Sequence, residues 1–247
     1  MSDRYGEFVQ SPLGKKVAKN LGLPLPTKLD RFEAGEKVVR GSVLFGSAAG
    51  EDSSVSEAIA TVLNKLHAEV YVAGDDANKA ALTGAGVEAK GSEDNSEKYK
   101  VLIFDASNIR YAPDLKEMYD FFHPVARQVE KSGRVIIVGR PPEECESIGE
   151  ALAQRALEGF VKSVGKEFKN GITSQLLYVS KDAEANIDST LRFFISARSA
   201  YVSGQVVRIG KGKVQELDWS KPFAGKTVLV TGASRGIGKA IAQNFEQ

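Results

Sequence analysis

The chain has 247 residues, of which 42% are hydrophobic and 26% are charged, as is ordinary for a globular protein. That length allows one large α/β domain, or one domain and a fragment of another. A formal net charge of +1 gives no electrostatic case for binding nucleic acid or an anionic membrane. The single cysteine, Cys145, excludes an internal disulfide and a cysteine-rich metal site. Because no apolar run is long enough for a signal peptide or a membrane span, we expect a cytoplasmic protein.

Residues 1–40 are expected to form an N-terminal arm that precedes the folded core. Ser11 followed by Pro12 is a typical helix start, since proline is favoured at the first helical position. We predict a short helix from there to residue 21. A glycine and two prolines at positions 22, 24 and 26 end it, and a polar stretch follows.

Residues 41–212 alternate between apolar strands and helical segments. We predict strands at 42–45, 69–73, 87–89, 101–104, 134–138, 176–179 and 205–209, with helices at 55–66, 113–129, 145–168 and 189–197. Nearly continuous apolar strands with helices between them indicate a parallel sheet that is covered on both faces. The predicted fold class is therefore α/β, a doubly wound parallel sheet of the Rossmann or flavodoxin-like kind, with 101–104 and 134–138 at its centre. Residues 213–224 are polar and turn-rich, and we expect a linker there.

Residues 225–247 form the last predicted segment, a truncated β–α unit with a glycine-rich turn. The apolar residues 228–230 predict a strand, and the turn leads into a helix. Three glycines at this spacing permit a tight turn, close approach of a pyrophosphate and packing of the helix against the strand. Free amides at the helix start would face the phosphates. The predicted cofactor-binding residues are Gly232, Ser234, Arg235, Gly236, Ile237 and Gly238.

The first domain contains an altered copy of the same turn at residues 45–52. Gly46 and Gly50 match the first two glycines, but Glu51 and Asp52 stand where the second copy has Ile237 and Gly238. These two carboxylates would lie where a pyrophosphate binds, and two unit charges about 4 Å apart repel by roughly 4 kcal/mol at an effective dielectric constant near 20. The third glycine is also lost. We therefore expect that the first domain does not bind a dinucleotide.

Residues 231–238 resemble the cofactor motif of the short-chain dehydrogenases/reductases almost letter for letter. Residues 156–167 are similar to the stretch that follows the family's catalytic Tyr-x-x-x-Lys, and 201–210 resemble its terminal strand segment. Counting back, the lysine position falls on Gln154 and the tyrosine position on Glu150. The sequence 139–142 stands where the catalytic serine would be. The first domain thus resembles a short-chain reductase without its catalytic residues, and we expect no catalytic residue in this chain.

A degenerate domain followed by an intact motif resembles one group in particular, the high-molecular-weight 3-oxoacyl-[acyl-carrier-protein] reductases. Segments 12–15, 23–26 and 31–35 of the arm also look like that group. The resemblance implies an enzyme of fatty acid biosynthesis that reduces a 3-oxoacyl thioester of acyl carrier protein or CoA with NADH or NADPH. It also implies that the Asn-Ser-Tyr-Lys set lies beyond residue 247. We therefore expect a longer parent protein to use NAD or NADP, and the 247-residue chain to be inactive with no cofactor bound.

Two other functions remain open from the sequence. The first domain could bind a mononucleotide such as FMN through the hydroxyls of residues 47–54, although Glu51 and Asp52 oppose this. It could instead be purely structural and serve assembly, substrate shaping or protein interaction. Because the matching helices of the family bury subunit contacts, a homodimer is also expected.

Other polar residues are weaker candidates for a site. Asp105 and Asn108 follow a strand at the edge where open α/β sheets bind ligands, although loop formation is the commoner role of these residue types. We expect His67 and His123 to be solvated or packed, and Cys145 to be an inert thiol. Three acidic residues, Glu143, Glu144 and Glu146, are expected to complement the dipole of the following helix. No spacing suggests a metal site.

The tail carries a prediction of its own. A lone strand at 228–230 would leave its backbone groups unpaired, and a single helix of this length is marginal in water. We therefore expect the segment to be disordered in solution, or to pair with an exposed sheet edge or a second molecule.

Overall fold

The computed structural model describes residues 4–23, 25–33, 35–73, 76–91, 97–214, 218, 221 and 223–245. The chain divides into two compact units, residues 1–212 and 213–247. Part of the expected linker, 213–224, lies outside the described residues.

Seven parallel strands form the sheet of the first unit, in the order β3-β2-β1-β4-β5-β6-β7. They are β1 Val43–Ser47, β2 Val70–Val72, β3 Ala89–Gly91, β4 Tyr99–Asp105, β5 Val129–Gly139, β6 Thr173–Val179 and β7 Gln205–Ile209. The predicted α/β fold with a doubly wound parallel sheet is confirmed. Strands β4 and β5 lie at its centre, as the sequence predicts.

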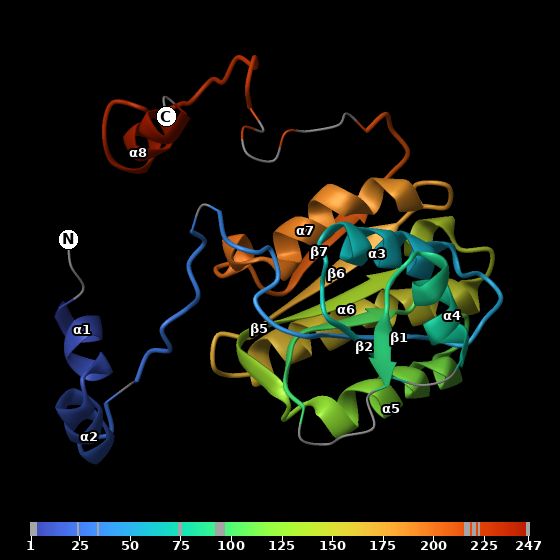
Figure 1. The fold of residues 1–247 in the computed structure, drawn as a ribbon, viewed down its shortest axis with the longest axis horizontal. Helices are drawn as coiled ribbons and strands as arrows, with labels where there is room; N and C mark the ends of the chain where they lie inside the picture. Colours follow the sequence, from blue (N-terminus) through green and yellow to red (C-terminus); the bar gives the residue numbers. More distant parts are fainter. Residues whose placement is uncertain are drawn as a thin grey trace. The chain divides into compact units, whose positions relative to one another are not determined.

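Helices cover both faces of this sheet (Figure 1). The α-helices of the first unit are α1 Arg4–Gln10, α2 Pro12–Asn20, α3 Ser54–Lys65, α4 Asp76–Gly84, α5 Lys116–Val125, α6 Ile148–Glu167 and α7 Asp188–Ile195. Alternate strand residues supply two separate cores. Val43, Phe45 and Ile103 pack with α3, α4 and α7 on one face. Leu44 and Phe104 pack with α5 and α6 on the other.

The predicted helix at 113–129 is wrong at its end. Helix α5 stops at Val125, directly after Pro124, and Val129 already begins β5 by pairing with Tyr99. Proline removes a backbone hydrogen bond inside a helix, which explains the early stop. Helices α1 and α4 are absent from the prediction because both are short and only weakly patterned. The predicted helix start at 145 also moves, to Ile148, where the side chain of Ser147 accepts a hydrogen bond from the amide of Glu150.

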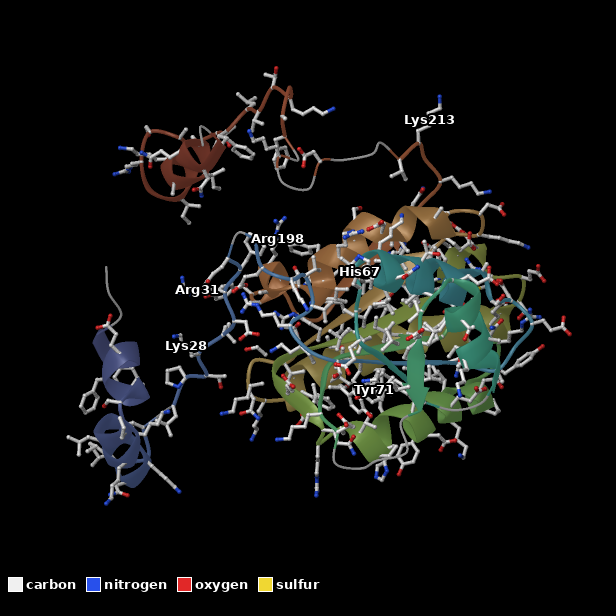
Figure 2. The ribbon with its side chains drawn as sticks, viewed as in Figure 1. Lys28, Arg31, His67, Tyr71, Arg198 and Lys213 are labelled. Atoms are coloured by element: carbon white, nitrogen blue, oxygen red, sulfur yellow. The ribbon has the colours of Figure 1, made fainter. Side chains whose placement is uncertain are left out.

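The arm is anchored to the sheet by its second half. The amide of Asp30 donates to the hydroxyl of Ser132 at 3.2 Å, and its carboxylate pairs with Lys100 at 2.7 Å. Farther along, the guanidinium of Arg198 lies 4.0 Å from the centre of the Phe32 ring. Figure 2 marks Arg198 on the body of this unit, and Lys28 and Arg31 on the arm.

Candidate functional site

A cavity of about 590 Å³ lies at the carboxyl ends of β1 and β4. These two strands are neighbours, and the strand order reverses between them. Open α/β sheets bind nucleotides at such a point, because the loops on either side diverge and leave a crevice. The cavity is lined by the turn between β1 and α3, by Phe104 at the end of β4 and by Phe121 of α5. It is the place in the first unit where a dinucleotide would be expected.

The anion-binding groups of this turn are already occupied by the protein's own carboxylates. The backbone amide of Ala49 donates to the Glu117 carboxylate of α5 at 2.7 Å. The amide of Ser54, at the start of α3, donates to Asp52 at 3.0 Å. Amides in these positions are the usual phosphate ligands of a nucleotide site. A phosphate could bind these amides only by displacing both carboxylates, and their negative charge would then lie beside it.

Asp52 is part of a charged network at this edge. Arg140, which follows β5, pairs with Asp52 at 2.8 Å and with Glu184 at 2.6 Å. It also donates to the hydroxyl of Ser54 at 3.0 Å. Burial raises the pKa of Asp52, but hydrogen bonds from Ser54 and Arg140 outweigh it and hold the pKa below its usual value. The network therefore keeps Asp52 ionised and fixed in the crevice.

The prediction that two carboxylates lie on the phosphate path is correct for only one of them. Asp52 lines the cavity, whereas Glu51 is exposed and does not line it. Repulsion of a phosphate by these carboxylates is therefore weaker than expected, because Arg140 neutralises Asp52. The obstacles are the internal partners of the turn amides and the side chains that fill the turn. Asn108 occupies the space above Gly50 and donates to the carbonyl of Asp52 at 2.9 Å.

Asp105 lies below the crevice and does not line it. It accepts from the hydroxyl of Ser56 at 2.6 Å and from the amide of Ser107 at 2.9 Å. Burial raises its pKa, although these hydrogen bonds oppose the rise. Asp105 and Asn108 thus both bind neighbouring backbone or side chains, which is the loop-forming role that their residue types favour.

The family's lysine position holds a buried structural residue. The side chain of Gln154 is fully buried and donates to the carbonyls of Ala106 and Ile109, each at 2.8 Å. Its carbonyl oxygen accepts from the amide of Arg140 at 2.9 Å. Gln154 therefore ties the ends of β4 and β5 to α6 and has no polar atom left for a ribose.

The family's tyrosine position, Glu150, lies one turn earlier on the same helix. Its carboxylate accepts from the amide of Glu146 at 3.2 Å, and it lines a second cavity of about 140 Å³ beside Arg140. Glu150 lacks the phenol hydroxyl that would donate a proton to a carbonyl in the family. Glu150 and Gln154 both lie on α6, and of the two only Glu150 lines one of the two cavities at this edge.

Cys145 also lines the smaller cavity. Burial, together with the nearby Glu150, Glu143 and Glu144, raises the pKa of its thiol to about 11. A thiol with such a pKa is a poor nucleophile at neutral pH, in line with the expected inert role.

The acidic residues before α6 do not act mainly on the helix dipole. Glu143 pairs with Arg208 at 2.6 Å, and Glu144 accepts from the hydroxyl of Ser180 at 2.7 Å. Both precede the helix, which begins at Ile148, so their expected role as helix-start charges is wrong.

The two histidines are exposed, and neither lines a cavity at the crevice. His123 stacks on Tyr119, with the ring centres 4.7 Å apart. Among the described residues, no cluster of His, Cys, Asp or Glu could hold a metal ion. None of the described helices is long and apolar enough to cross a membrane.

The second unit contains the intact glycine-rich turn. Helix α8 runs from Gly236 to Phe245, as predicted, but residues 226–230 are not a strand. The apolar pattern at 228–230 does not form a strand, because the described residues of this unit supply no partner strand for its backbone groups. Leu229 is 89% exposed as a result.

The turn itself keeps the geometry that its glycines allow. Gly232 and Gly236 have φ angles of 66° and 64°, which side chains rarely adopt. A side chain at Gly238 would collide with the carbonyl oxygen of Gly232. The first and third glycines therefore permit a compact turn that leads into a helix. Ser234, Arg235 and Ile237 lie in or directly after this turn.

Two residues of the crevice, Glu117 and Arg140, are not predicted from the sequence to lie there. Neither belongs to a motif, and each reaches the crevice from an element far from residues 45–54 in the chain. Only the strand order brings them together.

Comparisons with known proteins show which fold this is. No family model and no curated protein matches the sequence. Among solved structures, a short-chain dehydrogenase/reductase from Serratia marcescens BCRC 10948 is similar, with a TM-score of 0.52 and 16% identity, covering 72% of this chain and 99% of that one. BdcA from E. coli has a TM-score of 0.51 and 19% identity, over 70% of this chain and 100% of that one. BdcA in complex with NADPH has a TM-score of 0.50 and 17% identity, over 72% of this chain and 97% of that one. The chain has the Rossmann-like α/β fold of the short-chain dehydrogenases/reductases.

Proposed function

We propose that the chain is the N-terminal part of a NAD(P)H-dependent reductase of 3-oxoacyl thioesters, carried by acyl carrier protein or CoA. In this proposal the first unit is non-catalytic, and residues 225–247 contribute the phosphate-binding turn of a separate reductase domain. The fold is that of NAD(P)-dependent reductases, and BdcA of the same fold is known in complex with NADPH. The resemblance of the arm and of 231–238 to the 3-oxoacyl reductases supports the choice of substrate.

The non-catalytic role of the first unit depends on one observation above all. The amide that should bind a phosphate, that of Ala49, is bonded to Glu117 within the chain. The positions of the catalytic tyrosine and lysine hold Glu150 and Gln154, and Gln154 has its hydrogen-bonding groups satisfied by backbone. These observations support a crevice that lacks the family's phosphate ligand at Ala49 and its tyrosine and lysine.

The residues of the second unit fit a nicotinamide dinucleotide at its phosphates. Gly232, Gly236 and Gly238 leave the backbone open, and the amides at the start of α8 would hold the pyrophosphate. When bound, the cofactor supplies the hydride that reduces the ketone. The guanidinium of Arg235, in the same turn, is exposed and would add a positive charge beside the phosphates.

The first unit would then serve assembly or substrate shaping, as part of a homodimer. An apolar groove of about 380 Å³ between α5 and α6, lined by Tyr119, Phe122 and Phe160 among others, supports dimerisation. Light scattering on the purified chain measures this directly, and a monomer at micromolar concentration would contradict it.

A flavodoxin-like module is the alternative function. FMN binding needs free phosphate ligands in the turn 47–54, where Ala49 and Ser54 are bonded to carboxylates. A visible spectrum separates the two functions, because a flavin protein would be yellow.

The reductase proposal is tested by loss of NADPH or NADH absorbance with acetoacetyl-CoA. We expect no turnover by the 247-residue chain. We expect turnover by the longer product of the gene, with a Tyr-x-x-x-Lys beyond residue 247. A longer product that carries this motif but has no activity on 3-oxoacyl thioesters would contradict the proposal.

A further inference from the structure

A second large cavity, of about 560 Å³, lies between helix α2 of the arm and the sheet of the first unit. Five lysines line it: Lys15, Lys16, Lys19, Lys28 and Lys131. No acidic residue is among the residues that line it. The residues that line this cavity differ from those that line the crevice at β1 and β4. Nothing in the reductase fold requires so many like charges in one place.

The fold brings these lysines together by two separate devices. In α2, positions 15, 16 and 19 are spaced by three and four residues, which places their side chains on one side of the helix. The hydroxyl of Ser11 holds the start of this helix by accepting from the amide of Gly14 at 3.0 Å. Lys28 and Lys131 line the same cavity because Asp30 and Ser132, close to each in sequence, are hydrogen-bonded at 3.2 Å.

These positive charges are not compensated within the described part of the chain. None of the five ammonium groups takes part in an ion pair there, although many other lysines do, such as Lys65 and Lys100. All five side chains are exposed to solvent. Five like charges around one hollow repel one another, and a multiply charged anion would relieve that repulsion.

The cavity also has an apolar side. Val9, which is 1% exposed, lies in its wall with Pro12, Leu25 and Pro26. A volume of about 560 Å³ is in the range of sites for nucleotide-sized molecules and far exceeds a single phosphate ion. The ligand that fits is therefore a multiply phosphorylated molecule with a flat apolar group, such as a nucleotide.

We propose that this cavity binds the phosphorylated adenosine end of coenzyme A, as the handle of a CoA thioester. The proposal rests on the proposed function, which already makes an acyl thioester the substrate. CoA carries a 3′-phosphate and a 5′-pyrophosphate beside its adenine, so its charge and its apolar base match the lysines and the apolar wall. The lysine ammonium groups pair with the phosphates at the rim, and the base lies against the prolines.

Calorimetric titration of the 247-residue chain with CoA tests this proposal without any reductase activity. We expect 3′-dephospho-CoA to bind about tenfold more weakly, because it lacks one phosphate that the lysines would pair with. Raising the salt concentration from roughly 0.05 M to roughly 0.3 M should weaken CoA binding by a similar factor, since exposed charges are screened.

Two charge-matched variants decide where CoA binds. Lys16→Glu with Lys28→Glu changes the cavity, whereas Lys79→Glu with Lys162→Glu makes the same net change on exposed lysines elsewhere. We expect the cavity variant to bind CoA at least about thirtyfold more weakly and the control variant to bind as the wild type does. Circular dichroism shows whether both variants are folded, and a third variant, Lys131→Gln, gives an intermediate loss if the cavity variant unfolds.

Equal loss in both double variants, or equal binding of CoA and 3′-dephospho-CoA, would overturn the proposal. Retained binding in the cavity variant would also overturn it, and would assign CoA to the turn at 232–238. No binding of CoA, with binding of an acidic carrier protein that lacks the CoA moiety, would assign the lysines to a protein partner instead. CoA binding at the lysines by a chain whose longer product does not reduce 3-oxoacyl thioesters would leave this proposal standing and remove only the reductase.

Discussion

Replacing Arg140 with methionine removes the positive centre of the crevice at β1 and β4. The guanidinium is only 12% exposed and pairs with the carboxylates of Asp52 and Glu184. It also donates to the carbonyl of Val179 at 3.2 Å and to the hydroxyl of Ser54 at 3.0 Å. Methionine keeps an unbranched apolar stem but can replace none of these hydrogen bonds, so the two carboxylates lose their common partner.

The size of the loss follows from how exposed the two carboxylates are. Removing one partner of a buried ion pair costs about 3–5 kcal/mol, because the other charge stays buried and unpaired. Glu184 is 14% exposed and meets this description, whereas Asp52 is 42% exposed and keeps much of its hydration. We therefore expect a loss of about 3 kcal/mol in the free energy of unfolding. For a unit of this size, the melting temperature should fall by about 6–12 °C.

Urea and thermal unfolding followed by circular dichroism measure this loss at pH 7. Arg155→Met is the matched control, because Arg155 is 53% exposed and, in the described part of the chain, its ion pair is with Glu158. An exposed pair of this kind contributes about 0.5 kcal/mol or less. A loss for Arg140→Met that is no larger than the loss for this control would refute the assignment of Arg140 as the centre of the network.

The difference in stability between wild type and Arg140→Met depends on pH. The pKa of Asp52 is lowered in the folded chain from its usual value of 3.8, so its pairing stabilises the fold fully above that value. That stabilisation is lost as the pH falls through the lower, folded-state pKa. The difference between wild type and Arg140→Met should thus be largest near neutral pH and shrink below about pH 4. A difference that stays constant down to about pH 2.5 would contradict an ionic origin.

Three further predictions concern residues around the same crevice. Gln154→Leu should lower the free energy of unfolding by about 3 kcal/mol, since it removes three hydrogen bonds, to the amide of Arg140 and to the carbonyls of Ala106 and Ile109. Urea unfolding measures this loss, and a value below about 1 kcal/mol would contradict the assigned role. Glu117→Ala should lower the free energy of unfolding of the first unit by about 1–2 kcal/mol. Glu117→Gln should lower it by less, because glutamine keeps an acceptor for the amide of Ala49. Equal stability of the two variants would count against the hydrogen bond. Alkylation of Cys145 by iodoacetamide should be slow at pH 8, where about one thiol in a thousand is ionised, and should become faster up to about pH 11. A rate at pH 8 like that of free cysteine would show that the pKa of this thiol is not raised.

The arrangement of the sheet can be predicted from the sequence because it depends on local signals. Apolar runs such as 101–104 and 134–138 are too continuous for a half-exposed strand, and they become the central strands β4 and β5. Capping signals are equally local, as Ser11 at the start of α2 shows. The ends of the elements are less predictable, because they depend on tertiary contacts. Val129 continues the helical pattern in the sequence, but in the fold it pairs with Tyr99 as part of a strand.

The content of the crevice can be predicted only in part. The loss of the family's residues at Glu150 and Gln154 is visible in the sequence, since it needs only the counting of positions. The partners that fill the crevice are not visible, because Glu117 and Arg140 reach it through the tertiary fold from other elements. For the same reason, the sequence does not show that an arginine neutralises Asp52 and so weakens the expected repulsion of a phosphate.

We propose that the first unit, although it has the Rossmann-like fold of the short-chain reductases, binds no dinucleotide. Calorimetric titration of residues 1–212 with NADH and NADPH tests it most directly, because this unit excludes the glycine-rich turn at 232–238. With Glu117 on the amide of Ala49 and Asp52 on that of Ser54, we expect no saturable heat with either cofactor up to millimolar concentration. Binding of either cofactor with a micromolar dissociation constant would contradict the claim.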